Sequence, residues 1–310
     1  MIKPFTYFFI FFSAFFLKAQ ENLVPNPSFE EYSTCPLGLA DLTVLDWYAP
    51  TGGSSDYYNS CNLDVVSVPS NILGYQFAHT GNGYCGFGNV FGFPNGNQRE
   101  YIQIQLLNNL ESGKNYLFKG FFNLADSSRY CIKNLGIVIS TNAIGGAFGT
   151  AILYNQVLTF PQNISINDVN QWVEINISFT ANGGEKFLTI GLFNEDSSSI
   201  INEVNPLNND FSYYYVDDVS ITEVKFDEIP NFFSPNNDND NDEWIAFVPE
   251  VTEFSIINRW GEVIIKGKSK GNLITWNGKS SNGNECSEGV YFYKIDHLQE
   301  VKTGFIQLMR

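Results

Sequence analysis

Aromatic and polar side chains gather in the first half of the sequence, and they are the first candidates for binding chemistry. The set that we predict to contact glycan consists of Trp47, Tyr48, Asp56, Tyr57, Tyr58 and Arg129. Flat rings can stack against a sugar, while a carboxylate or a guanidinium group can hydrogen-bond its hydroxyl groups. The Gly, Ser and Pro residues around the aromatic part of this set indicate loops, where binding residues concentrate. The alternative is that the rings fill the core of the fold. Further residues of the same kind follow at Tyr75, His79 and Tyr84.

The motifs of common catalytic sites are missing from the sequence. Its two histidines are His79 and His297, and no GxSxG, HExxH or phosphate-binding loop occurs. Asp and Glu are abundant, so a carboxylate pair that hydrolyses glycosidic bonds stays an alternative. We therefore predict a protein that binds without catalysing a reaction.

Five cysteines could form disulfide bridges or bind a metal ion. They are Cys35, Cys61, Cys85, Cys131 and Cys286. The first four allow two bridges and three connectivities, of which we favour Cys35 with Cys61 and Cys85 with Cys131, leaving Cys286 free. A thiolate metal site is the weaker alternative, because the sequence contains no CxxC pair.

Alternating apolar and polar residues predict β-strands as the elements that position these side chains. In residues 101–106, Ile102, Ile104 and Leu106 alternate with polar neighbours, and residues 172–179 repeat this pattern. Clusters of Gly and Asn, such as residues 182–184, separate the strand-like segments as turns do. No stretch outside the N-terminus carries a helical stripe. The sequence therefore predicts an all-β fold.

The N-terminus, the charge and the composition bound the organisation of the chain. Residues 1–19 predict a secretory signal peptide, because Lys3 precedes an apolar run that ends before the small Ala19. No later segment is apolar for the roughly 20 residues that a membrane span needs. We place the domain boundary between residues 225 and 226, before a segment rich in Pro, Asn and Asp. The net charge of −16 argues against nucleic acid as a partner.

The second domain, residues 226–310, carries an ordered set of sequence blocks. These are IPNFFSPNNDNDNDEW, FSIINRWGEVII, TWNGKSSNG, CSEGVYFYKI and KTGFIQLMR. Residues 229–310 thereby resemble the gliding-motility-associated C-terminal domain of Bacteroidetes, the sorting module of proteins exported by type IX secretion. The resemblance implies a small immunoglobulin-like β-sandwich that the export machinery recognises. Asp238, Asp240 and Asp242 in the first block could ligate Ca²⁺ or form a solvated turn.

The first domain, residues 20–225, carries a second resemblance. Its segments NLVPNPSFEEYSTCP, DYYNSC, HTGNGYCGF, REYIQIQL, LADSSRYCIKNLG, GGEKFLTIGLF and YYYVDDVSI resemble the N-terminal jelly-roll domains of Bacteroidetes surface proteins. These domains are similar to carbohydrate-binding modules of the galactose-binding-like type. The resemblance implies that the SFE segment and the DDV strand lie side by side, with Glu30 and Asp217 sharing a structural Ca²⁺. The alternative is a direct hydrogen-bonded contact between these two segments.

These observations predict a secreted or cell-surface binding or adhesion protein, exported by type IX secretion, whose N-terminal jelly-roll domain contacts glycan. Its expected partners are the type IX secretion machinery and a polysaccharide or a surface protein, with neither nucleic acid nor membrane insertion. One alternative is a structural envelope protein that binds another protein. A hydrolase is the other.

Overall fold

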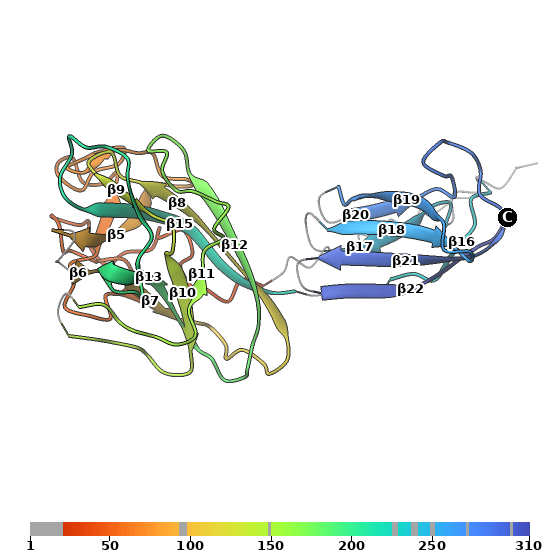
Figure 1. Cartoon of the computed structure of the whole chain (residues 1–310), viewed down its shortest axis with the longest axis horizontal. Coiled ribbons are helices and arrows are strands. Elements are labelled where there is room, and N and C mark those ends of the chain that lie inside the picture. The colour runs from red at the N-terminus through yellow and green to blue at the C-terminus, as the bar shows by residue number, and fades with distance from the viewer. Residues whose placement is uncertain are drawn as a thin grey trace, which may run out of the picture.

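The computed structural model of the chain describes residues 21–92, 98–147, 150–224, 229–236, 241–248, 252–270, 273–297 and 300–310. The regular structure of these residues consists of β-strands and one short 3-10 turn, η1 (Asp196–Ser198), so the all-β prediction is confirmed. Figure 1 shows one group of strands formed by residues up to 224 and another formed by residues from 229 onward. The signal peptide predicted at residues 1–19 and the predicted boundary at residue 225 lie outside the described residues.

One layer of the N-terminal domain is a five-stranded antiparallel sheet. Its strands, in spatial order, are β1 (Trp47–Tyr48), β7 (Ile102–Gln105), β13 (Phe187–Gly191), β10 (Gly136–Ser140) and β11 (Leu158–Thr159). As the alternation predicts, Ile102, Ile104 and Leu106 are buried in the core. Gln103 between them is buried as well, because the segment that contains Ile144 and Ile152 covers the other side of this sheet.

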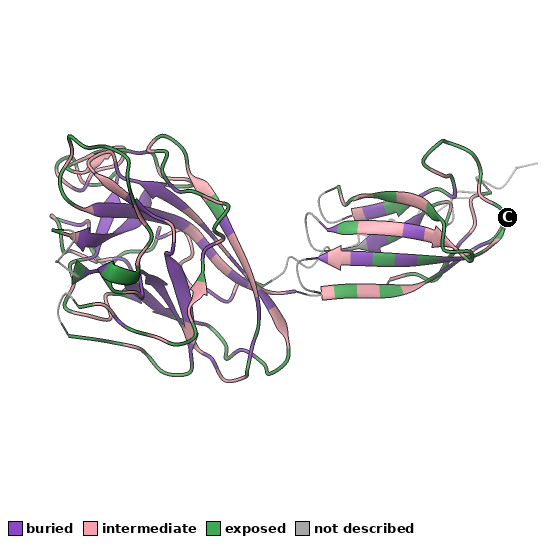
Figure 2. Cartoon of the chain, in the orientation of Figure 1, coloured by how far each residue is buried: buried purple, intermediate pink, exposed green. Residues whose placement is uncertain are grey.

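The second layer is a six-stranded antiparallel sheet. Its strands are β12 (Val173–Thr180), β8 (Asn115–Leu124), β15 (Ser212–Glu223), β5 (Gly83–Phe91) and β2 (Asp56–Asn59), with β6 (Gln98–Arg99) paired to β5. Apolar side chains from both sheets meet in one core, for example Phe118, Ile190 and Tyr214. Figure 2 shows buried residues along the strands of both sheets. Two layers that share one apolar core form the β-sandwich that the sequence predicts.

The outer side of the six-stranded sheet is covered at one end by residues 60–79, which we call the cover segment. It contains the hairpin of β3 (Ser70–Asn71) and β4 (Gly74–Tyr75). Val66 packs there against a second cluster of buried rings, Tyr58, Tyr84, Tyr213 and Tyr215. The hydroxyl of Tyr215 donates to Asn71 Oδ1 at 2.8 Å, and Asn71 Nδ2 donates to the hydroxyl of Tyr84 at 3.0 Å. These contacts tie the cover segment to the sheet. A separate strand pair, β9 (Tyr130–Ile132) and β14 (Ile201–Glu203), lies beyond the end of β8.

The disulfide prediction is half confirmed. Cys35 and Cys61 form a bridge with their Cα atoms 6.0 Å apart, which joins the loop before β1 to the residue that follows β2 by two positions. The predicted bridge between Cys85 and Cys131 is wrong, since both are free thiols buried in the core, on β5 and β9 respectively. Cys286 is also free.

The C-terminal residues form a smaller sandwich. One sheet contains β16 (Phe232–Phe233), β22 (Glu300–Leu308), β21 (Gly289–His297), β18 (Glu253–Asn258) and β19 (Val263–Lys268), and the other pairs β17 (Trp244–Phe247) with β20 (Leu273–Trp276). Trp244, Trp276 and Ile295 lie in the core between them. A tight turn joins β18 to β19, with Gly261 at a φ of +84°, a conformation that favours glycine.

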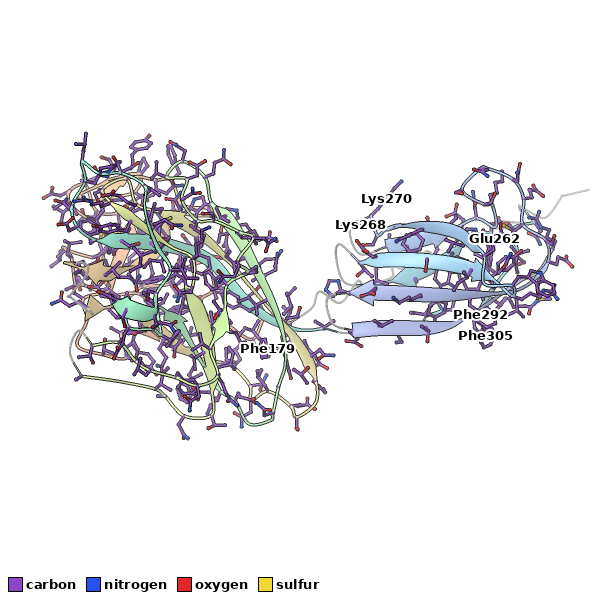
Figure 3. All side chains as sticks on the ribbon, in the orientation of Figure 1. Phe179, Glu262, Lys268, Lys270, Phe292 and Phe305 are labelled. Atoms are coloured by element: carbon purple, nitrogen blue, oxygen red, sulfur yellow. A yellow bond between two sulfur atoms is a disulfide. The ribbon has the colours of Figure 1, made fainter. Side chains whose placement is uncertain are left out.

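The outer face of the five-stranded C-terminal sheet is less polar than a solvent-facing sheet usually is. Phe292 on β21 and Phe305 on β22 are directly paired across the strands, and both point away from the core (Figure 3). Their exposed fractions are 43% and 49%. A sandwich with one polar face would place charged or hydroxyl side chains at such positions.

Candidate functional site

Three of the four aromatic residues predicted to bind glycan, Trp47, Tyr57 and Tyr58, are divided between two buried clusters. Trp47 is 3% exposed, and its indole N–H donates to the carbonyl of Asn26 at 3.1 Å. Tyr57 and Tyr58 are adjacent on β2 and point to opposite sides of the sheet, Tyr57 into the sandwich core and Tyr58 into the cluster beneath the cover segment. The open platform predicted from these three rings is therefore wrong. Both sides of β2 are covered, which the sequence pattern did not reveal.

The polar members of the predicted set are also separated from one another. Tyr48 is 38% exposed on the five-stranded sheet and donates its hydroxyl to Gln103 Oε1. Arg129 precedes β9 and forms ion pairs with Glu203 and Asp210, both at 2.6 Å. The predicted set does not form one site.

Asp56 is the buried member of that set. One carboxylate oxygen accepts a 2.6 Å hydrogen bond from the backbone N–H of Ala40, and the other accepts a bond from the hydroxyl of Tyr213. Burial, together with the nearby Glu100 charge, raises the pKa of Asp56 to about 7, although these hydrogen bonds act to lower it. The carboxyl group is enclosed by its own fold and does not face a ligand.

Asp56 should make the domain less stable as the pH rises. Its folded pKa lies above the ordinary value of 3.8, so the folded state binds the proton more tightly. The stabilisation is fully present below about pH 4 and is lost as the pH rises through about 7. Between pH 4 and pH 8, the free energy of unfolding of wild type should fall by on the order of 2 to 4 kcal/mol more than that of Asp56→Asn.

Urea unfolding of the full chain at a series of pH values measures this effect. The matched control is Asp64→Asn, since the side chain of Asp64 is exposed. An identical pH dependence in wild type and Asp56→Asn would contradict the burial of charge at this position.

The two segments expected to hold Ca²⁺ do lie side by side. The N–H of Val219 on β15 donates to the carbonyl of Pro27 at 2.9 Å, just before Glu30. However, Glu30 Oε1 accepts the backbone N–H groups of Asn82 and Gly83, at 2.7 and 2.9 Å. Its second oxygen accepts the side-chain amide of Asn82 at 3.2 Å. Both oxygens of Glu30 therefore face N–H donors.

Asp217 is held in the same way. Its Oδ2 accepts the backbone N–H groups of His79 and Thr80, and its Oδ1 accepts that of Asp218. Burial raises the pKa of Asp217 to about 8, helped by the neighbouring Asp218 charge. Among the described residues, no group of three or more His, Cys, Asp or Glu side chains could hold a metal ion. Because donors surround these oxygens, Glu30 and Asp217 do not fit a Ca²⁺ centre. Asp238 and Asp240 lie outside the described residues.

A different set of rings lies near the surface, and we call it the aromatic strip. It consists of Tyr75, Phe77, Trp172, His79 and Phe121. The rings of Tyr75 and Phe77 meet edge to face at 5.5 Å, and the indole N–H of Trp172 donates to the carbonyl of Phe77 at 2.9 Å. The ring of His79 lies 6.2 Å from that of Trp172 and stacks on Phe121 at 3.7 Å. Ring contacts and one hydrogen bond thus connect all five residues.

The two ends of the aromatic strip differ in exposure. Tyr75 and Phe77 are 58% and 61% exposed, whereas Trp172, His79 and Phe121 are half-buried. Asp126 anchors the exposed end by accepting the backbone N–H of Tyr75 at 2.5 Å. Rings that are held by backbone contacts while their faces stay open can receive a flat ligand at little entropic cost.

Polar side chains continue the surface beyond Phe121, and we call them the polar face. Glu174 on β12 is directly opposite Phe121 on β8, and Asn176 is opposite Lys119 in the same strand pair. Asn176 Nδ2 donates to Glu174 Oε1 at 2.5 Å, and Lys119 Nζ lies 3.7 Å from Glu174 Oε2. This end of the sheet presents an ammonium, an amide and a carboxylate beside an aromatic ring.

The sequence reasoning named Tyr75 and His79 but missed Phe77, Phe121 and the polar face. Alternation in β12 already indicated that Glu174 and Asn176 point away from the core. What it could not indicate is which residues of the cover segment would lie over the sheet.

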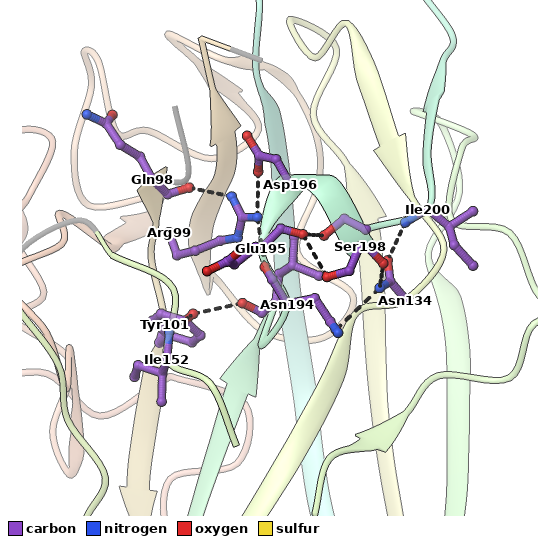
Figure 4. Close-up of polar contacts among 12 residues, drawn as sticks. Gln98, Arg99, Tyr101, Asn134, Ile152, Asn194, Glu195, Asp196, Ser198 and Ile200 are labelled. Carbon is purple, nitrogen blue, oxygen red and sulfur yellow. Dashed lines mark hydrogen bonds and ion pairs between the residues drawn. The ribbon is translucent and has the colours of Figure 1, made fainter. Parts of the chain in front are cut away.

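A second polar network is buried and has a structural role. Arg99 donates to the carbonyls of Gln98 and Asn194, both at 2.9 Å, and pairs with Asp196 at 2.5 Å (Figure 4). The side chains of Arg99 and Asp196 are 0% and 2% exposed. This ion pair joins β6 to the 3-10 turn η1 inside the domain and has no open surface for a ligand.

Comparisons with known proteins give a family for the C-terminal part of the chain. Residues 227–308 match the CHU_C Type IX secretion signal domain. No curated protein matches the chain. No helix among the described residues is long and apolar enough to cross a membrane.

Several solved structures are similar to the chain. The CBM22-1 xylan-binding domain of Paenibacillus barcinonensis Xyn10C is 14% identical with a TM-score of 0.34, and the match covers 67% of this chain and 97% of that one. The K1 cleaved adhesin domain of Lys-gingipain from Porphyromonas gingivalis W83 is 14% identical with a TM-score of 0.31, covering 63% and 95%.

The C-terminal match agrees with the ordered sequence blocks and with the small sandwich that they form. A type IX secretion signal domain directs its protein to the cell surface or the extracellular space. Residues 227–308 therefore match the type IX secretion signal domain family, and this match indicates export to the cell surface or the extracellular space.

Proposed function

We propose that the N-terminal domain is a non-catalytic binding domain that contacts glycan through the aromatic strip and the adjoining polar face. The observation that carries this proposal is the exposure of the neighbouring aromatic residues Tyr75 and Phe77, which are 58% and 61% exposed. Sugar rings have apolar faces and hydroxyl edges, so they need both aromatic and hydrogen-bonding partners. The strip offers the first kind, and Lys119, Glu174 and Asn176 offer the second.

Export supports this proposal, because a binding domain outside the cell meets polysaccharides of its own or other organisms. The absence of catalysis is part of the proposal. Two candidate acidic residues, Asp56 and Asp126, both accept hydrogen bonds within the domain. Asp56 accepts them from Ala40 and Tyr213, and Asp126 accepts one from the backbone N–H of Tyr75.

Phe77→Ala should lower the affinity for a retained polysaccharide by about tenfold, because a central aromatic contact is lost. The substitution keeps the backbone carbonyl that Trp172 and Gln76 contact, so the cover segment should stay in place. Affinity electrophoresis of the purified chain in gels that contain a panel of neutral polysaccharides measures the effect.

Two control variants accompany this experiment. Phe77→Tyr keeps a ring and should bind like wild type. Leu153→Ala removes a 65% exposed side chain beside Ile152, which packs on the outer side of the other sheet, and it should also leave binding unchanged. Retention of wild type on none of the polysaccharides would overturn the glycan assignment. Equal retention of Phe77→Ala would overturn the site.

A further inference from the structure

The outer face of the five-stranded C-terminal sheet carries an apolar row that crosses four strands. Phe305 on β22 is paired with Phe292 on β21, Phe292 is paired with Ile257 on β18, and Ile257 is paired with Val263 on β19. Directly opposite residues in adjacent strands point to the same face with Cβ atoms about 4.5 to 5.5 Å apart. These four side chains, the apolar row, are therefore contiguous neighbours.

The apolar row is open to solvent. Phe305, Phe292 and Val263 are 49%, 43% and 54% exposed, and Ile257 is half-buried. The turn at the end of β18 adds Trp260, which is 84% exposed. Contiguous apolar surface of this kind is uncommon on a protein without a partner and marks interaction sites.

Positive charge borders the row on both sides. Lys294 and Lys266 are each paired with Ser255, two residues before Ile257 on β18, so they lie on the same face. Two residues after Ile257 comes Arg259, whose guanidinium lies 5.9 Å from the ring of Trp260. Lys294 also contacts Asp296, whereas neither Lys266 nor Arg259 has an ion pair among the described residues. Cations on both sides of an apolar row are notable in a chain of net charge −16.

We propose that this face is the surface by which a protein of the export machinery recognises the folded C-terminal domain. The occupant is a protein segment with apolar side chains between carboxylates, because that arrangement complements the row and its flanking cations. Every residue of the row, of its charged border and of the turn lies within the matched type IX secretion signal domain. Recognition of a folded domain must use its surface, and the opposite face of this sheet is occupied by the core. The inference rests on the family match and is independent of the glycan proposal.

The test uses the full chain in a cell with a working type IX secretion system. We expect the paired change Phe292→Thr and Phe305→Thr to reduce the protein outside the cell about tenfold, since central apolar contacts dominate such interfaces. Threonine keeps the β-propensity of both positions. The matched control is Val301→Thr, a 50% exposed position on β22 that is paired with Asp296 and stands outside the row. Immunoblots of medium, cell surface and periplasm give the readout, and thermal unfolding of each purified chain checks the fold.

Charge variants keep the test decisive if the paired variant fails to fold. Lys266→Glu and Arg259→Glu change exposed side chains, so they should fold normally and still reduce export. Normal export of folded charge variants would overturn the proposal. A second result would also overturn it, namely that wild type is a dimer in analytical ultracentrifugation while the paired variant is a monomer that is exported normally. The row would then bind a second copy of the chain.

Discussion

A chain that ends at residue 226 should accumulate in the periplasm and be nearly absent from the cell surface and the medium. The missing residues 227–308 are the type IX secretion signal domain, and the remaining part has its own apolar core from Leu23 to Ile221. The shortened chain should therefore stay folded while it loses the surface that we propose the export machinery recognises. Cell fractionation followed by immunoblotting measures the distribution.

The matched control for this deletion is full-length Phe77→Ala, which should be exported like wild type because the aromatic strip belongs to the other domain. Comparable amounts of shortened and full-length protein in the medium would contradict the assignment of residues 227–308. If the shortened chain is degraded, it will be absent from the periplasm as well as from the medium. The distributions of the shortened and full-length chains are then compared in a protease-deficient strain.

Arg99→Ala should destabilise the N-terminal domain by about 3 to 5 kcal/mol. The change leaves the carboxylate of Asp196, which is 2% exposed, without the guanidinium that pairs with it. Removing one partner of a buried pair is costly because the other charge stays in a medium that solvates it poorly. Urea unfolding of the full chain measures this loss of stability through the transition of the N-terminal domain.

Arg129→Ala is the matched control, since this arginine pairs with the carboxylates of Glu203 and Asp210 but is 29% exposed. Exposed ion pairs contribute about 1 kcal/mol or less. The double variant Arg99→Met with Asp196→Leu should recover much of the lost stability, because apolar side chains can replace a buried ion pair. Equal destabilisation by Arg99→Ala and Arg129→Ala would show that burial does not decide the effect.

The strand pattern of this fold is readable from the sequence, because a half-buried strand repeats every two residues. The alternation of Ile102 and Ile104, or of Ile175 and Phe179, predicts both the strand and the face that meets the core. The type IX module is readable for a different reason, since its five blocks occur in a fixed order.

The location of the proposed binding surface could not be predicted from the sequence in the same way. Tyr57 is buried in the sandwich core, and Tyr58, on the opposite side of the same strand, is buried because residues 60–79 fold back over the sheet. Such a cover depends on contacts between distant residues, such as that of Asn71 with Tyr215, and leaves no periodic pattern. Phe77 stays exposed although its neighbours Gln76 and Ala78 are covered, which no local rule predicts.

The two free cysteines of the sandwich core have a consequence for the passage of this protein through an oxidising compartment. Burial raises the pKa of the Cys85 thiol well above its usual range and also raises that of Cys131. The thiolate is the form that reacts with oxidants and with other disulfides. Once the sandwich has folded, both thiols should react slowly with oxidants and disulfides. In the unfolded chain they can instead form disulfides with Cys35 or Cys61. We therefore expect the bridge between Cys35 and Cys61 to form with fewer competing pairings when the core closes before the thiols are oxidised.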